Sequence, residues 1–100
     1  MMPVIWHEEA AREFAQAAIF YELRVEGLGE RFTIQVEAAL TKVRNSPLVF
    51  RCVEGECRKA GVDRFPYAVV YRVSAMGDLQ ILALAHFKKR PGYWKQRIEE

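Results

Sequence analysis

The chain has 100 residues, of which 51% are hydrophobic and 28% are charged, as in an ordinary soluble globular domain. A chain of this length forms one domain, here residues 1–100, and no apolar run approaches the roughly 20 residues of a membrane span. The N-terminal segment lacks the features of a secretory signal, so the sequence predicts a cytoplasmic protein that does not enter the membrane.

The net charge is only +2, but it is unevenly distributed. Residues 1–50 contain five cationic side chains and seven carboxylates, whereas residues 51–100 contain ten cations and six carboxylates. Such a basic region is typical of contact with nucleic acid or with an acidic protein. The alternative is a basic surface that only keeps the domain soluble, and composition alone favours neither.

The first half of the chain predicts one short strand and two helices. Val4–Trp6 is the strand, and from Glu8 onward apolar residues recur at spacings of three and four, as in an amphipathic helix. Gly27-Leu28-Gly29 breaks this helix, and Asn45-Ser46-Pro47 ends a second one. A short link between two amphipathic helices predicts an antiparallel helical hairpin. The apolar faces contain Ala10, Phe14, Ala17, Ala18, Tyr21 and Val25 in the first helix, and Phe32, Val36, Ala39, Leu40 and Val43 in the second.

The second half has the pattern of strands. Residues 49–54 and 56–62 predict two weak strands around Gly55, and the alternating run Tyr67–Val73 predicts a stronger one. Residues 79–87 are nearly all apolar, which indicates a central strand, and residues 75–78 form the turn before it. We expect an α+β domain with the order β-α-α-β-β-β, in which the helical hairpin packs on one face of a small antiparallel sheet.

Few common enzyme classes fit this sequence. It has no nucleophile elbow, phosphate loop, dinucleotide fingerprint or zinc-protease motif. Cys52 and Cys57 are the only cysteines, and no second Cys or His pair lies at metal-ligand spacing. We therefore expect free thiols, no metal and no cofactor, while a disulfide stays open if residues 50–58 form a hairpin.

The candidates for chemistry are cations and proton carriers, and each also has a structural interpretation. His86 can act as a general acid or base, or can simply satisfy a backbone group at a strand end. Arg58 and Lys59 can stabilise a phosphate, or can be solvated charges on an edge strand. Tyr93 and Trp94 can stack on bases, or can fix the tail to the core.

Two stretches carry a resemblance to a known family: RFPYAVVYR at residues 64–72 and HFKKRPGYWKQR at residues 86–97. Together with the element order and the two helix-ending segments, they resemble the RelE/ParE superfamily of toxins, over nearly the whole chain. The resemblance implies the RelE/ParE-like toxin fold and a cytoplasmic growth inhibitor of the plasmid-stabilization type. It also implies a small cognate antitoxin that neutralises the toxin in a hetero-oligomer.

The superfamily divides by mechanism. RelE-like members are ribosome-dependent ribonucleases that cleave mRNA with a cluster of cationic, acidic and tyrosine side chains, whereas ParE-like members poison DNA gyrase by protein contact. Some nuclease members have an arginine where this chain has Ala68. The resemblance therefore favours the ParE-like interpretation. A RelE-like nuclease using Arg58, Lys59, His86 and Tyr93 stays an alternative, as does a non-toxic module that only binds antitoxin.

The resemblance also implies two contact surfaces. The expected antitoxin contacts lie on the helical hairpin, at Phe14, Tyr21, Phe32 and Val36. The expected contacts with the target (gyrase, or the ribosome and mRNA) are the cations and aromatics of the second half. They are Arg58, Lys59, Arg64, Arg72, Lys88, Lys89, Arg90, Tyr93, Trp94 and Arg97.

Overall fold

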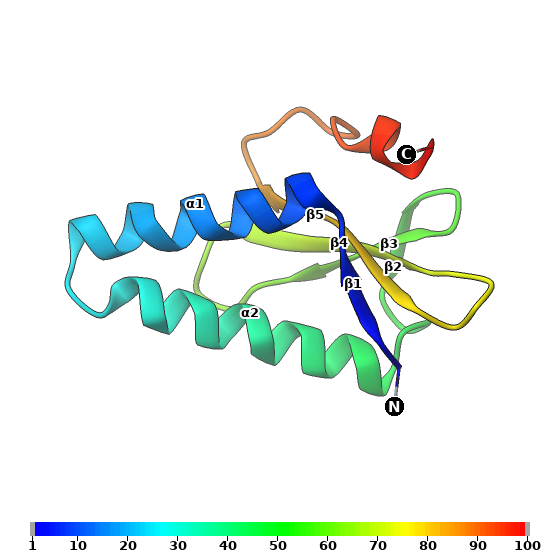
Figure 1. Cartoon of the computed structure of the whole chain (residues 1–100), viewed down its shortest axis with the longest axis horizontal. Coiled ribbons are helices and arrows are strands. Elements are labelled where there is room, and N and C mark those ends of the chain that lie inside the picture. Colours follow the sequence, from blue (N-terminus) through cyan, green and yellow to red (C-terminus); the bar gives the residue numbers. More distant parts are fainter. Residues whose placement is uncertain (1, 100) are drawn as a thin grey trace.

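The computed structural model describes residues 2–99 as two helices packed on a five-stranded sheet (Figure 1). The predicted α+β class is confirmed, but the order is β-α-α-β-β-β-β, because both weak runs around Gly55 form strands of their own. The elements are β1 (Val4–Trp6), α1 (Glu8–Arg24), α2 (Leu28–Asn45), β2 (Arg51–Glu54), β3 (Cys57–Gly61), β4 (Tyr67–Val73), β5 (Leu79–His86) and the short 3-10 helix η1 (Lys95–Glu99).

The sheet is mixed, which corrects the prediction of a wholly antiparallel one. Its strand order is β1-β5-β4-β3-β2, and the last four strands form antiparallel pairs. The first strand runs parallel to β5, with Val4 opposite Leu79 and Trp6 opposite Ile81. A parallel neighbour needs a long crossover connection, and here the crossover contains the helical hairpin and the other strands.

Side chains that accept hydrogen bonds from backbone N–H groups explain where the helices begin. The Glu9 N–H donates to Nδ1 of His7, which caps α1. At the link, Gly27 has a positive φ of 84°, and the Glu22 carboxylate accepts from the N–H groups of Gly27 and Gly29 at 2.8 and 3.0 Å. This carboxylate satisfies amides at the start of α2 that have no partner within the helix. Gly29 also permits close helix contact, because a Cβ there would lie 2.5 Å from the Ala18 carbonyl oxygen.

The main core lies between the helices and one face of the sheet. Phe32 and Val36 of α2 have no exposed surface. The Phe32 ring makes contacts with four other rings, those of Phe14, Tyr21, Phe65 and Tyr67. Two of the four predicted antitoxin contacts are therefore corrected: the side chains of Phe32 and Val36 form the core and leave no surface for a partner.

A smaller core covers the opposite face of the sheet. After β5 the chain turns back over this face, and Trp94, only 5% exposed, packs against Cys57, Val70, Leu82 and Ala83. Both cysteines are free thiols, with Cys52 exposed and Cys57 buried. Among residues 2–99, neither helix is long and apolar enough to cross a membrane.

Candidate binding cleft

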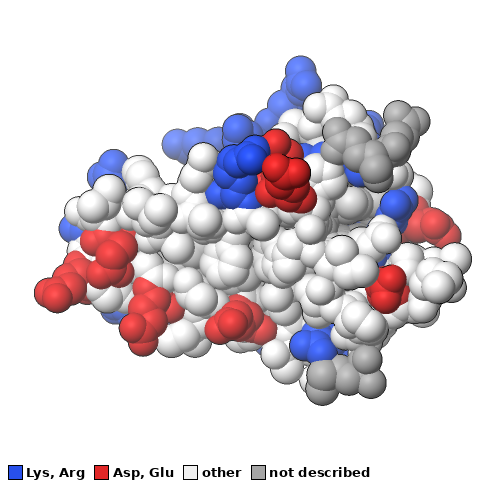
Figure 2. Space-filling view, in the orientation of Figure 1, with Lys and Arg blue, Asp and Glu red and all other residues white. Residues whose placement is uncertain are grey.

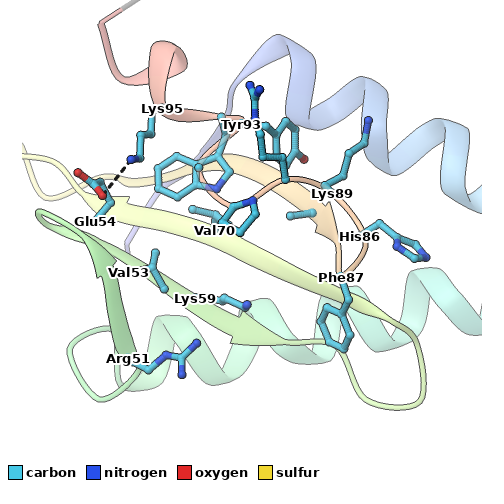
Figure 3. A pocket seen from close by; sticks show the side chains of 15 residues that line it. Arg51, Val53, Glu54, Lys59, Val70, His86, Phe87, Lys89, Tyr93 and Lys95 are labelled. Carbon is cyan, nitrogen blue, oxygen red and sulfur yellow. Dashed lines mark ion pairs between the residues drawn. The ribbon is translucent and has the colours of Figure 1, made fainter.

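A cleft of about 360 Å³ lies between the β2–β3 side of the sheet and the tail, residues 87–95 (Figure 3). Its floor is apolar, with Val53 and Val70 from the sheet and Trp94 from the tail. Five exposed cations line it, two from strands and three from the tail. They are Arg51, Lys59, Lys89, Arg90 and Lys95. We refer to this site as the basic cleft.

The two ends of the basic cleft differ. At one end Lys95 Nζ lies 3.3 Å from a Glu54 carboxylate oxygen, so an ion pair joins the tail to the end of β2 (Figure 3). At the other end the Lys59 ammonium lies 5.8 Å from the centre of the Phe87 ring, which is 60% exposed. The cleft is therefore bridged at Glu54 and open at Phe87.

Arg58 and Lys59 lie on opposite faces of the sheet, because successive side chains of a strand alternate. Lys59 lines the basic cleft, whereas Arg58 lies on the helix side and donates to the Phe50 carbonyl oxygen at 2.7 Å. The prediction that the two act together on one anion is wrong for this reason. Of these two residues, a ligand in the cleft can reach only Lys59.

His86 has structural contacts at the rim of the basic cleft. Its Nδ1 accepts from the Lys88 N–H at 3.0 Å, and its ring lies edge-on to Tyr67, with 5.0 Å between ring centres. The imidazole points away from the middle of the cleft (Figure 3). The ring thus fixes the turn that follows β5.

Tyr93 and Arg97 meet at a carboxylate that no sequence pattern singles out, that of Glu13 in α1. The Tyr93 hydroxyl donates to Glu13 at 2.6 Å, and two Arg97 nitrogens donate to its two oxygens at 3.0 Å each. The Leu84 N–H donates to the same carboxylate at 3.1 Å, and Arg97 also donates to the Leu82 carbonyl oxygen at 2.9 Å. The side chains of Glu13 and Arg97 therefore form hydrogen bonds with the backbone groups of β5 that lie beyond the end of β1.

This arrangement, which we call the Glu13 hub, removes two residues from the predicted target surface. Burial is the main cause that raises the pKa of Tyr93, and the Glu13 carboxylate raises it further. The phenol therefore stays a hydrogen-bond donor at neutral pH. The Arg97 side chain is only 11% exposed and pairs with Glu13, so its charge already has a partner.

The other predicted target contacts are scattered. Trp94 belongs to the smaller core, and Arg72 donates to the Gln80 side chain at 2.7 Å and to the Ile98 carbonyl oxygen at 3.4 Å. Arg64 and Lys88 are exposed but do not line the basic cleft. Of the ten predicted positions, three line the cleft as cations that form no ion pair within residues 2–99: Lys59, Lys89 and Arg90.

The helical hairpin has a different surface from the tail. Carboxylates gather along the hairpin and cations near the tail (Figure 2). Near the free end of the hairpin, α1 exposes three large apolar side chains, Ile19, Phe20 and Leu23, of which Leu23 is 83% exposed. Their pattern follows the helical period on the side opposite the core, a signal that was readable in the sequence.

Comparisons with known proteins show a similarity to solved structures. No family model and no curated protein matches the sequence. Among solved structures, this chain is similar to a chain titled "Chromosomal ParDE TA system from P. aeruginosa", with a TM-score of 0.61 and 21% sequence identity. The match covers 86% of this chain and 96% of that one. The predicted RelE/ParE-like fold is thus confirmed: this chain has the fold of a component of a ParDE TA system.

Proposed function

We propose that this chain is the toxin of a type II toxin–antitoxin system and acts in the cytoplasm until a cognate antitoxin neutralises it. The observation that carries the proposal is the fold, which the chain shares over 86% of its length with a component of a ParDE TA system. The resemblance carried by residues 64–72 and 86–97 supports the same conclusion independently of the structure.

The antitoxin docks on the outer side of α1 in this proposal. Ile19, Phe20 and Leu23 give it an exposed apolar surface, which soluble proteins seldom leave uncovered without a partner. An amphipathic helix laid against α1 would cover all three. Phe14 and Tyr21 are partly buried and pack against the main core.

The proposed mechanism is ParE-like: the toxin inhibits DNA gyrase by protein contact and does not cleave RNA. Cleavage through the ribose 2′-hydroxyl needs a base, an acid and a cation close to one phosphate. Here Arg58 lies on the far face, Tyr93 is bound to Glu13 and His86 is bound to the turn after β5. Ala68, which stands where some nuclease members have an arginine, has no charge to contribute. The dispersal of these groups supports inhibition by contact.

Induced expression of this chain is expected to arrest growth, because a free toxin would reach its target. Co-expression of a cognate antitoxin, to be sought in the reading frames adjacent to the gene, is expected to restore growth, because the antitoxin would cover the toxin. Colony counts after induction measure both effects, with the core variant Phe32→Ala, which is expected to destabilise the fold, as a non-toxic control. Normal growth at high soluble expression would contradict the proposal and favour a non-toxic module that only binds antitoxin.

His86→Gln is expected to remain fully toxic, because glutamine can still accept from the Lys88 N–H while the imidazole that could act as a general acid or base is removed. The purified wild-type protein is expected to inhibit supercoiling by gyrase and to leave ribosome-bound mRNA intact. On a nuclease mechanism, loss of a general acid or base would lower the activity by about 100-fold. Message cleavage by the wild type that disappears in His86→Gln would establish the RelE-like alternative.

A further inference from the structure

The basic cleft combines positive charge with an uncommitted surface. Among residues 2–99, four of its five cations form no ion pair: Arg51, Lys59, Lys89 and Arg90. The one carboxylate in the lining, Glu54, is paired with Lys95. Four cations around one opening favour an occupant with several negative charges.

The cleft also offers apolar contact. Val53 and Ala85 are partly buried in the floor, and Phe87 exposes most of its ring at the open end. A volume of about 360 Å³ lies at the lower end of the range of about 300–1,000 Å³ seen for ligand pockets. An occupant that carries only charges would leave this apolar floor in contact with water. We therefore expect an occupant with an apolar side chain between its negative charges.

The aromatic residues of the cleft do not suit a nucleic acid. Single strands bind by stacking bases on exposed aromatic faces. Trp94 is 5% exposed because its ring packs into the smaller core, and the Tyr93 hydroxyl is bound to Glu13 while the Lys89 ammonium lies 5.5 Å from the ring centre. Within the described lining, Phe87 is the one aromatic ring that is largely exposed. One such ring provides no platform for successive bases.

We propose that the basic cleft binds an acidic, extended segment of the toxin's target protein, with one large apolar side chain against Val53, Ala85 and Phe87. Carboxylates on either side of that residue would meet Lys59 and Arg90. Because Lys95 and Glu54 bridge the other end, the segment enters beside Phe87. The chemistry follows from the cleft, whereas the identity of the occupant as the target rests on the proposed function.

The test uses purified protein and a fluorescent peptide with one leucine between pairs of acidic residues, followed by fluorescence polarisation. The double variant Lys59→Ala/Arg90→Ala is expected to bind it about ten-fold more weakly at low salt, since each exposed ion pair contributes roughly 0.7 kcal/mol. The matched control Arg31→Ala/Lys42→Ala removes two exposed cations from α2 and is expected to change the affinity less than about two-fold. Phe87→Ala is expected to cost about ten-fold through lost apolar contact.

Three results would overturn this proposal. The first is equal loss of peptide binding in the two double variants, which would indicate a general charge effect. The second is tighter binding of a single-stranded oligouridylate than of the peptide, which would assign the cleft to nucleic acid. The third comes from cells: a Lys59→Ala/Arg90→Ala toxin that still arrests growth but no longer binds antitoxin would assign the segment to the antitoxin. A wild type that fails to arrest growth refutes the toxin function alone, because the peptide measurement does not depend on toxicity.

Discussion

Phe32→Ala is expected to lower the free energy of unfolding by about 4 kcal/mol, the usual cost of removing a fully buried aromatic ring. The ring has no exposed surface and contacts the four rings of Phe14, Tyr21, Phe65 and Tyr67. A cavity there would loosen both helices from the sheet. Urea denaturation followed by circular dichroism measures the change, which is a large fraction of the stability of a domain of this size.

Leu23→Ala is the matched control for Phe32→Ala, because Leu23 is also an apolar residue of the helical hairpin but is 83% exposed. Its expected effect on the free energy of unfolding is within about 0.5 kcal/mol. Leu23→Ala should stay folded but bind antitoxin more weakly, because Leu23 belongs to the proposed docking surface. A Phe32→Ala protein of unchanged stability that fails to bind antitoxin would restore Phe32 as a contact residue.

Glu13→Ala is expected to lower the free energy of unfolding by about 3 kcal/mol, because it leaves the Arg97 charge without its partner. The two side chains are only 11% and 19% exposed, and the change also removes the acceptor of the Tyr93 hydroxyl and the Leu84 N–H. Without the carboxylate, the tail should separate from the sheet. In a Trp6→Phe background, a red shift of Trp94 fluorescence would report that separation.

Glu9→Ala provides the matched control for Glu13→Ala on the same helix. Glu9 forms an ion pair with Arg12 at 2.6 Å, but both side chains are about half exposed. The expected loss of unfolding free energy is small, because water screens an exposed pair. If Glu13→Ala were no more destabilising than Glu9→Ala, the Glu13 hub would not hold the tail.

The elements with a strong period could be predicted from the sequence. Both helices have an apolar stripe long enough to identify, and glycines and a proline mark their limits. The parallel pairing of β1 could not be predicted, because a strand of three residues has no pattern that specifies a partner. Its neighbour is decided by the crossover and by the room left beside β5.

The candidate site was predicted less well, and for identifiable reasons. Strand alternation already implies that Arg58 and Lys59 point to opposite faces, so that error was avoidable. The roles of Tyr93 and Arg97 depend on Glu13, which lies 84 positions before Arg97 in the chain. A carboxylate beside the apolar stripe of a helix was the available signal, but nothing local identifies its partner. Long-range polar contacts are invisible to periodicity.

The parallel pairing of β1 with β5 has a consequence for the order of folding. The helical hairpin and the strands from β2 to β5 each join neighbours in sequence, so they form without closing long loops. Val4 must instead find Leu79, and Glu13 must find Arg97, across nearly the whole chain. These late steps cost the most loop-closure entropy. We therefore expect the flank of β5 to be completed last, and both terminal segments must pack there before its edge is shielded from other chains.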